Sequence, residues 1–356
     1  MVIKKREKRI RVMLLLMLLV TASGLLLAYF TSSVTEKPLY NTAVNAARKM
    51  SACMEEIAAE KARRGIEIPP EDIFSTGLIG EDYNDITTTS GDLAAKRTSA
   101  NPDMASMMVF MLDEAGIKAG DTVGCNFSGS FPALNIATVC ACDAMGVRVV
   151  YICACGASTW GANNPGLSFP EMADVLYKKN LISAPPVLVT PGGGKDTGSG
   201  LDPELFSEVW ERAEALGYPT LTEEDFEKNV LARKAVLDAY DIDCFVAVGG
   251  HLASLGRGDV VYLLGQGIIR EEVGFTNEKS GLVERYLNGG TPTILLLNIK
   301  KLAADYGLPF DPVKQAEVGT AGLYYEKTYN KAVLITAPAA FLCLLILFKK
   351  PHKKSE

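Results

Sequence analysis

The sequence predicts an α/β fold, a doubly wound (Rossmann-like) parallel sheet of about five strands, flanked by an N-terminal and a C-terminal transmembrane helix. Short apolar runs bounded by glycine or proline alternate with segments whose apolar residues recur at helical spacing. This alternation is typical of parallel sheets with helices in their connections. An uncharged run near each end is long enough to cross a bilayer. The expected strands are Thr122–Phe127, Val147–Cys153, Pro186–Thr190, Asp243–Val248 and Thr293–Leu297.

The clearest unit of this sheet is the segment Asp121–Gly146. A loop of small residues, Ser128-Gly129-Ser130, follows the first strand and leads to Pro132, a residue favoured at the start of a helix. Helical spacing then continues to Gly146, and the second strand follows directly. Strand–loop–helix–strand units of this kind form right-handed crossovers. The other expected helices are Pro38–Arg64, Pro102–Ala115, Phe169–Lys179, Asp202–Leu216, Glu223–Tyr240 and Ile299–Tyr306.

The two ends predict a membrane topology. Val12–Phe30 and Ala332–Phe348 carry no charge, and basic clusters lie at Lys4–Arg11 and Lys349–Lys354. The positive-inside rule places both clusters in the cytoplasm, so residues 31–331 should face outward from the plasma membrane. A cleaved signal peptide is the alternative for the first segment. Because no small-x-small cleavage pattern follows it, we expect an uncleaved anchor.

The expected domain organisation follows from these segments. The helix after the first span could lie along the folded domain or stand as a stalk, and Ile66–Ser99 shows no period, which indicates a long structured loop. The parts are a cytoplasmic basic tail (1–11), a transmembrane helix (12–30), a stalk helix, long loop and helix (31–120), an extracytoplasmic α/β domain (121–331), a second transmembrane helix (332–348) and a basic tail (349–356).

Charge and cysteine usage limit the possible partners. The net charge is −6, and the two tails carry +5 and +3, which leaves −14 for residues 12–348. An acidic body argues against a nucleic-acid partner, because affinity for phosphate backbones comes mainly from Lys and Arg. Of the eight cysteines, Cys343 lies in the second span and seven lie before it. Their spacings fit no zinc or redox motif, so buried thiols are the expectation rather than a disulfide framework.

Four strand ends continue into loops rich in Gly and Ser. In an open parallel sheet, ligands bind beyond the carboxyl ends of the strands. Glycine lets the backbone approach a ligand closely, so these loops predict one pocket lined with backbone donors and hydroxyls. The loops are Ser128–Pro132, Cys155–Asn164, Pro191–Gly200 and Gly249–Ser254.

None of the sharp nucleotide or hydrolase motifs is present in these loops. Gly192–Gly200 lacks the Ser or Thr that follows the lysine of a P-loop, and Ser128 and Ser130 lack the flanking glycines of a nucleophile elbow. Flexible turns that need positive φ are an equal explanation for Gly192–Gly200. With one histidine outside the tail and scattered carboxylates, we expect no metal site, and no cofactor is indicated.

The candidate residues fall into two groups. As a catalytic group, His251 could act as general base for Ser128 or Ser130, with Asp196 or Asp259 orienting its ring. A structural role for a lone histidine is the alternative. Cations beside Ser, Thr or Gly suit a carboxylate or phosphate, although Lys96 and Arg97 could equally be a solvated helix end. The candidate ligand-binding residues are Lys96, Arg97, Gly129, Ser158, Asn163, Gly192, Gly193, Gly194, Lys195 and Asp196.

Several long blocks give the chain a resemblance to a known family. They are TGLIG (76–80), ITTTSGDLAAKRTSANPD (86–103), SGSFPALNIA (128–137), GASTWGANNP (156–165) and PGGGKDTGSGL (191–201). In this order they resemble the poly-γ-glutamate system proteins, membrane proteins found with the ligase and membrane subunits that make this capsule polymer. The resemblance covers nearly the whole chain, including both terminal anchors. It implies a role in making, exporting or trimming poly-γ-glutamate, but it assigns no catalytic residue.

Three hypotheses remain open from the sequence. The first is a membrane-anchored accessory protein of poly-γ-glutamate synthesis or export, which binds a glutamate-bearing group of the polymer or its precursor in the strand-end pocket. The second is a Ser/His-dependent hydrolase or transferase acting on γ-glutamyl amide bonds. The third is a non-catalytic scaffold for the membrane subunits of the polymer synthase. Only the second requires His251 together with a serine, so whether the protein is an enzyme stays undecided at this stage.

Overall fold

The computed structural model describes residues 2–258 and 264–349. The chain divides into two compact units. Unit 1 joins residues 1–38 to residues 325–356, and unit 2 comprises residues 39–324. The residues of each unit therefore pack mainly against other residues of the same unit.

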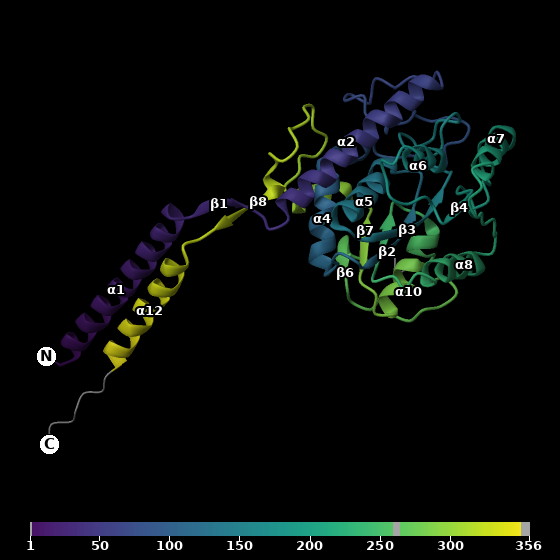
Figure 1. The fold of residues 1–356 in the computed structure, drawn as a ribbon. Helices are drawn as coiled ribbons and strands as arrows, with labels where there is room; N and C mark the ends of the chain where they lie inside the picture. Colours follow the sequence, from purple (N-terminus) through teal and green to yellow (C-terminus); the bar gives the residue numbers. More distant parts are fainter. Residues whose placement is uncertain (1, 259–263, 350–356) are drawn as a thin grey trace. The chain divides into compact units, whose positions relative to one another are not determined.

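Unit 1 pairs the two ends of the chain. Helix α1 (Val2–Phe30) leads into strand β1 (Ser33–Glu36), and strand β8 (Tyr325–Thr328) leads into helix α12 (Lys331–Lys349) (Figure 1). The two strands pair antiparallel, with Ser33 opposite Thr328. Helices α1 and α12 pack against each other, and a Cβ added at the buried Gly24 would lie 2.7 Å from the Cβ of Ala337. A small residue is thus required where these helices meet.

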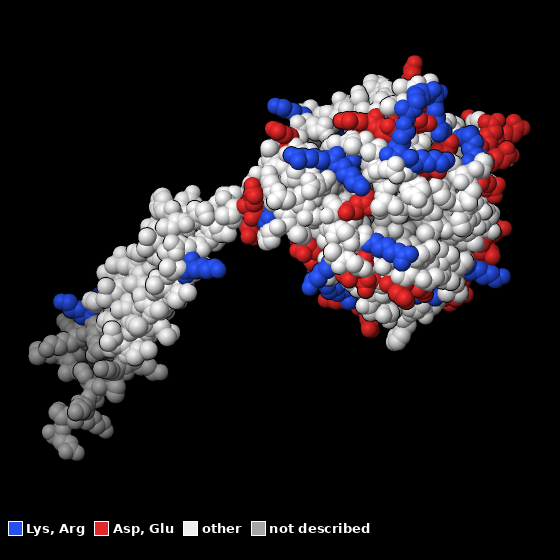
Figure 2. Space-filling model, in the orientation of Figure 1, with Lys and Arg blue, Asp and Glu red and all other residues white. Residues whose placement is uncertain are grey.

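Both helices of unit 1 are long and apolar enough to cross a membrane. The apolar segments are Ile10–Phe30 and Lys331–Phe348, with mean hydropathies of 2.4 and 2.3. Their surface is almost free of charged side chains over most of its length, whereas the visible face of unit 2 carries both signs (Figure 2). The structure therefore bears out two apolar terminal helices. Pro338 lies inside α12, and membrane helices tolerate an internal proline.

Unit 2 is built on a six-stranded, mostly parallel sheet in the order β4-β3-β2-β5-β7-β6. Strand β2 pairs parallel with both β3 and β5, so the strand order reverses at β2. All five expected strands form in parallel, within two residues of their expected bounds; β6 was not expected and pairs antiparallel with β7. The strands are β2 (Thr122–Phe127), β3 (Arg148–Ala154), β4 (Leu188–Thr190), β5 (Cys244–Val248), β6 (Gly267–Ile269) and β7 (Thr293–Leu296).

Local sequence signals fix the helices that connect these strands. Helix α5 (Pro132–Met145) has proline in its first turn and ends at Gly146, whose φ of +69° is the left-handed conformation that favours glycine. Helix α6 (Phe169–Lys178) begins with a capping box between Ser168 and Glu171. The side chains of Asp202 and Asp225 cap the next two helices. The other helices of unit 2 are α3 (Leu93–Ser99), α7 (Pro203–Glu214), α9 (Leu252–Leu255), α11 (Ile299–Asp305) and a 3₁₀ turn (Gly322–Tyr324).

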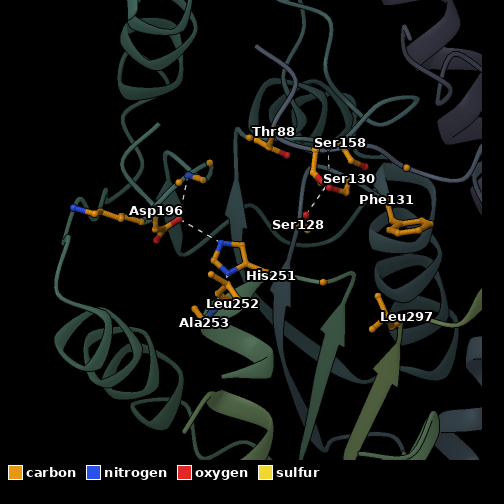
Figure 3. A pocket seen from close by; sticks show the side chains of 18 of the residues that line it. Thr88, Ser128, Ser130, Phe131, Ser158, Asp196, His251, Leu252, Ala253 and Leu297 are labelled. Carbon is orange, nitrogen blue, oxygen red and sulfur yellow. Dashed lines mark hydrogen bonds and ion pairs between the residues drawn. The ribbon is translucent and has the colours of Figure 1, made fainter. Parts of the chain in front are cut away.

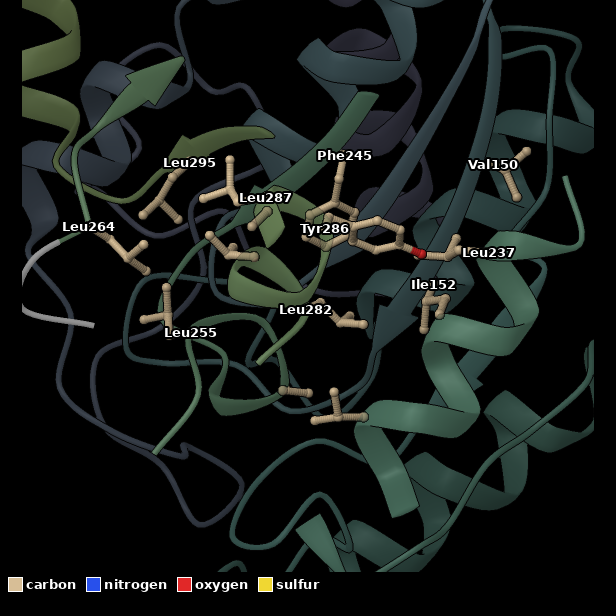
Figure 4. Close-up of a cluster of buried hydrophobic side chains, with 14 of the residues drawn as sticks. Val150, Ile152, Leu237, Phe245, Leu255, Leu264, Leu282, Tyr286, Leu287 and Leu295 are labelled. Carbon is tan, nitrogen blue, oxygen red and sulfur yellow. The ribbon is translucent and has the colours of Figure 1, made fainter. Parts of the chain in front are cut away.

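Two groups of helices cover the sheet. Helices α2 (Tyr40–Arg63), α4 (Asp103–Ala115) and α5 pack together, whereas α8 (Phe226–Asp238) and α10 (Leu282–Asn288) share an apolar cluster with β3, β5 and β7. Figure 1 shows the two groups on opposite sides of the sheet. In the second cluster the ring of Tyr286 stacks on Phe245 with 4.6 Å between ring centroids (Figure 4).

The segment before residue 121 contributes to unit 2. Helix α2 buries the face that carries Ala43, Ala47, Met50 and Ile57, and it packs on α4 and α5. Of the two expectations for this helix, the structure has it lying along the domain. The segment after Gly65 is mostly irregular, as expected, until α3 begins at Leu93.

Candidate functional site

A cavity of about 550 Å³ lies at the carboxyl edge of the sheet in unit 2 (Figure 3). It is bordered by the segments that follow β2, β3, β4, β5 and β7, because parallel strands present their outgoing loops on one edge. The segment before α3 supplies a further wall. The lining residues are Thr88–Gly91, Lys96, Ser128, Ser130, Phe131, Gly156, Ser158, Gly192–Asp196, Phe226, Asn229, Gly250–Ala253, Arg257 and Leu297.

Glycines allow these loops to converge. A Cβ at Gly156 would lie 2.6 Å from the backbone nitrogen of Gly193, and one at Gly129 would lie 2.8 Å from the carbonyl oxygen of Gly156. Gly192 and Gly193 also have φ angles of +72° and +70°. Backbone therefore packs directly on backbone around the cavity, which no larger residue would permit. This gives the glycine-rich composition a structural reason in the three loops that follow β2, β3 and β4.

Asp196 is the centre of a buried polar network at the cavity. Its carboxylate accepts hydrogen bonds from Arg233, from the Asn229 side chain at 2.8 Å and from the backbone N–H of Gly192 at 3.0 Å. The Thr190 hydroxyl also donates to it, at 3.2 Å. Burial alone would raise the pKa of Asp196, but the charge of Arg233 and the hydrogen bond from His251 outweigh it and hold the pKa well below its usual range. Asp196 is therefore an anion whose oxygens are fully engaged.

Arg233 is the fully buried partner of this carboxylate and ties three elements together. Its guanidinium donates to Asn126 of β2 at 2.5 Å, to Thr190 of β4 at 2.8 Å and to Asn229 of α8 at 2.8 Å. The network holds Asp196, and with it the loop after β4, in place. Lys195 and Asp196 have left-handed φ angles of +53° and +61°, each costing about 1–2 kcal/mol, which such a network can offset.

His251 is oriented by two hydrogen bonds. Its Nδ1 accepts from the backbone N–H of Ala253 at 3.1 Å, so the neutral ring carries its proton on Nε2. That Nε2 faces the Asp196 carboxylate at 3.3 Å (Figure 3). Both ring nitrogens are thus engaged. Within residues 2–258 and 264–349, no hydrogen bond joins the His251 ring to a serine, and Asp259 lies outside the described residues.

Three serines gather on one wall of the cavity (Figure 3). The backbone N–H of Ser130 donates to the Ser128 hydroxyl at 3.1 Å, and the backbone N–H of Ser158 donates to the Ser130 hydroxyl at 3.0 Å. The loops after β2 and β3 are therefore tied together by serine side chains. This accounts for Ser128 and Ser130 without a catalytic role for either.

Lys96 is the buried lysine of this wall. Its Nζ donates to the Ser158 hydroxyl at 2.9 Å and to the backbone carbonyl of Ser130, and it lies 3.7 Å from the centroid of the Phe131 ring. Burial lowers the pKa of Lys96 to about 7, with a small opposing effect from the charge of Asp92. A lysine with this pKa exchanges a proton near neutrality.

The other predicted binding residues divide between the cavity and its surroundings. Lys195 lines the cavity with an exposed side chain that pairs with Glu224. Arg97 is not among the lining residues; it forms two hydrogen bonds of 2.6 and 2.7 Å with Asp311. Asn163 is buried and bonds Glu81, Asp82 and Thr87, so it fastens the segment 81–87 to the loop after β3. Gly129 supports the packing behind the lining.

Several site residues were not found from the sequence. Arg257 lines the cavity beside Phe226, with its guanidinium 4.4 Å from the ring centroid. Arg233 had a detectable signal, because it occupies the same face of the expected helix as Val230 and Leu237. A charged residue at a core position of a helix indicates a buried partner. Nothing in the sequence indicated that Thr88–Gly91 form a wall of the cavity.

The described residues contain no cluster of three or more His, Cys, Asp or Glu side chains arranged to hold a metal ion. No protein-family model, curated protein or solved structure matches the chain.

Proposed function

We propose that the chain is a membrane-anchored accessory protein of poly-γ-glutamate synthesis or export, with a doubly wound domain whose strand-end pocket binds a glutamate-bearing group. In this proposal both tails are cytoplasmic and unit 2 faces outward. The membrane subunits of the polymer synthase are its expected partners. The resemblance of the sequence blocks suggests poly-γ-glutamate as the polymer. The pocket suggests that the protein binds part of it.

The observation that carries the binding role is the position and charge of the cavity. It lies at the carboxyl edge where the strand order reverses at β2, the place where doubly wound sheets bind ligands. Its lining includes two exposed cations, Lys195 and Arg257, together with Lys96, whose pKa of about 7 leaves it only partly charged at neutral pH. Among the described residues of that lining, Asp196 is the only carboxylate, and its charge is balanced by Arg233. An anionic ligand group is therefore favoured over a cationic one.

A γ-glutamyl unit fits this lining in its functional groups. Its free carboxylate suits the exposed cations, since charge-assisted hydrogen bonds are stronger than neutral ones. Its amide needs donors and acceptors, which the hydroxyls of Thr88, Thr89 and Ser90 and the loop backbones provide. The acidic body does not oppose this arrangement, because only one unit of the chain has to enter the pocket.

The Ser/His hydrolase is the weaker candidate. A general base needs a free nitrogen toward its nucleophile, and both ring nitrogens of His251 are engaged, by Ala253 and by Asp196. The scaffold hypothesis remains the alternative that the binding experiment decides.

Calorimetry on the full chain in detergent with a γ-linked glutamate trimer tests the proposal. We expect measurable heat for the γ-linked peptide and less for an α-linked trimer. Arg257→Ala should weaken binding by about 10- to 100-fold, the effect of losing one hydrogen bond to a charged group of about 1.5–3 kcal/mol. Arg97→Ala is the matched control, because its guanidinium pairs with Asp311 instead of lining the cavity. Absence of heat for the unmodified protein would favour the scaffold.

Capsule measurement connects the pocket to the polymer. A deletion strain should lose or alter its poly-γ-glutamate, and the wild-type gene should restore it. Complementation with Arg257→Ala at normal protein level should fail, whereas Arg97→Ala should succeed. Full restoration of the capsule by both variants would show that the pocket is not needed for poly-γ-glutamate production.

A further inference from the structure

Lys96 is buried without an acidic partner at hydrogen-bond distance. Its side chain comes from α3, whose first turn is capped by Asp92, and the residue is 2% exposed. In the described part of the chain no carboxylate lies within 4.0 Å of its Nζ, and its contacts are the Ser158 hydroxyl, the Ser130 carbonyl and the Phe131 ring. A purely structural ammonium would normally be paired when buried this deeply.

The two hydrogen-bonded contacts also suit the neutral amine, whereas the Phe131 ring suits the ammonium. A neutral lysine has two N–H groups and one lone pair. One N–H can donate to the Ser130 carbonyl, and the lone pair can then accept the O–H of Ser158, 2.9 Å away. Burial and a neutral surrounding both favour this form. The contact between Lys96 and Ser158 therefore has the geometry of a nucleophile and its base.

Ser158 is positioned at the cavity itself. It lines the cavity, and its backbone N–H is held by the Ser130 hydroxyl at 3.0 Å. The residue opposite it is Gly91, where an added Cβ would lie 3.0 Å from the Ser158 hydroxyl oxygen and 3.1 Å from Cε of Lys96. The backbone of Gly91 thus packs closely on both reacting groups, and any larger residue there would press on them. Access from the cavity is what a nucleophile needs and a structural serine does not.

We propose that Ser158 is a nucleophile, with Lys96 as its general base, for acyl transfer from an amide or ester that enters the cavity. The reaction type stands on this pair alone, while the assignment of γ-glutamyl amides as the substrate class rests on the proposed function. This activity lies beyond ligand binding. It also differs from the Ser/His hypothesis, since neither His251 nor Ser128 takes part.

The steps balance with water as the only co-reactant. The Ser158 oxygen bonds to the carbonyl carbon as its proton passes to Nζ of Lys96. The C–N or C–O bond of the substrate then breaks, and the leaving amine or alcohol takes that proton. Water next attacks the acyl-serine and gives a proton to Lys96, which returns it to the Ser158 oxygen as the carboxylic acid leaves. An amine in place of water would give transfer instead of hydrolysis.

A serine-directed fluorophosphonate on the full chain in detergent tests the pair. We expect one adduct by intact mass, located on Ser158 by peptide mapping, with a labelling rate that rises with pH around pH 7. Ser158→Ala should abolish labelling. Lys96→Met should slow it by about 100- to 10,000-fold, the usual range for loss of a general base. The exposed Ser207→Ala on α7 is the control and should label as the unmodified protein does.

Two further measurements keep the outcome unambiguous. Thermal melting of each variant shows whether it is folded, and Gly91→Ala, which crowds the pair without altering it, should also slow labelling. No adduct on the unmodified protein, an adduct on another serine, or an unchanged rate in folded Lys96→Met would each overturn the inference. Binding of the γ-glutamate trimer by a protein that forms no fluorophosphonate adduct would overturn the nucleophile proposal and leave the proposed binding function standing. Labelling of Ser158 without binding of that trimer would support Ser158 as a nucleophile and reject γ-glutamyl amides as its substrate class.

Discussion

Arg233 donates to the carboxylate of Asp196 in a buried ion pair beneath the candidate site. Arg233 comes from α8 and Asp196 from the loop after β4, so the pair fixes that loop relative to a helix. The carboxylate also faces His251, whose other nitrogen is held by the backbone of Ala253. Asp196 is thus one of the two carboxylates that the sequence offered as partners of the His251 ring, and both residues also support the wall of the pocket.

Asp196→Asn should destabilise unit 2 strongly. The substitution leaves Arg233 buried without a counter-ion, and breaking such a pair typically costs about 3–5 kcal/mol of unfolding free energy. Urea unfolding of the full chain in detergent, followed by tryptophan fluorescence, measures the effect. Lys195→Ala is the matched control, because its pair with Glu224 is exposed and should contribute nothing measurable. Equal stability of Asp196→Asn and wild type would mean that Arg233 is satisfied by its neutral partners.

The same pair predicts the direction of acid sensitivity. The folded pKa of Asp196 lies well below the unfolded value of about 3.9, so its stabilising contribution is complete above that value. The contribution is lost as the pH falls from about 4 through the folded pKa. The difference in unfolding free energy between wild type and Asp196→Asn should therefore shrink on acidification. A difference that grows toward low pH would contradict this assignment.

Lys96→Met should stabilise the protein most at and below neutral pH. The pKa of Lys96 is about 7 when folded and about 10.4 when unfolded, so folding displaces a proton between these values. The unfolded state then binds more protons, and wild-type stability rises with pH through that window. Below pH 7 wild type bears the full cost of the buried charge. The excess stability of the variant should fall between pH 7 and about 10.4, and an excess independent of pH would show that Lys96 is not displaced from its ordinary pKa.

The positions of Lys96 and Arg97 illustrate what the sequence could predict of the site. Both are cations next to Thr and Ser, and the sequence assigned both to the ligand. Neighbouring residues of a helix point about 100° apart, so only one can face a given cavity. Lys96 enters the wall, while Arg97 bonds Asp311, which is more than 200 residues away in sequence. Such a distant partner has no local signal.

The strands show the same division between local and tertiary information. The parallel strands were predictable because each is an apolar run bounded by Gly or Pro, and buried parallel strands have that pattern. Strand β6 has only three residues, Gly267–Ile269, and β1 and β8 have four residues each and many polar side chains. Their pairing depends on the rest of the fold. The convergence of the glycine-rich loops was predictable, since it follows from parallel strand order.

The cysteines of unit 2 should be unreactive in the folded protein. All seven are buried free thiols. Burial raises the pKa of Cys125, Cys140, Cys142, Cys153, Cys155 and Cys244 above the ordinary value, and the thiolate is the reactive form. In a Cys343→Ser background, a thiol-reactive dye at pH 8 should therefore modify none of them in native protein and all seven in urea. Rapid modification of one native thiol would place it at the surface.

The last prediction is that both ends of the chain lie on the same side of the membrane. The antiparallel pair β1–β8 connects α1 and α12, so both helices leave it in the same direction. The two helices also pack at Gly24 and Ala337. With basic residues beyond both, that side should be the cytoplasm. A fluorescent protein that matures only in the cytosol, fused after Glu356, should be bright. Protease added to protoplasts should remove unit 2.

Oxidative cross-linking separates this arrangement from two independently inserted helices. Cysteines introduced as Gly24→Cys and Ala337→Cys should form a disulfide in membranes, because an added Cβ at position 24 would lie 2.7 Å from that of Ala337. The helices then have to separate by only about 1 Å to reach the Cβ–Cβ distance of about 3.8 Å that a disulfide needs. Leu25→Cys with Ala337→Cys is the control; Leu25 is 68% exposed on α1 and points away from the helix contact, so this pair should cross-link far less. The Cys343→Ser background removes the native thiol of α12. Equal cross-linking by both pairs would mean that α1 and α12 do not pack in this register, and protection of unit 2 from protease would reverse the topology.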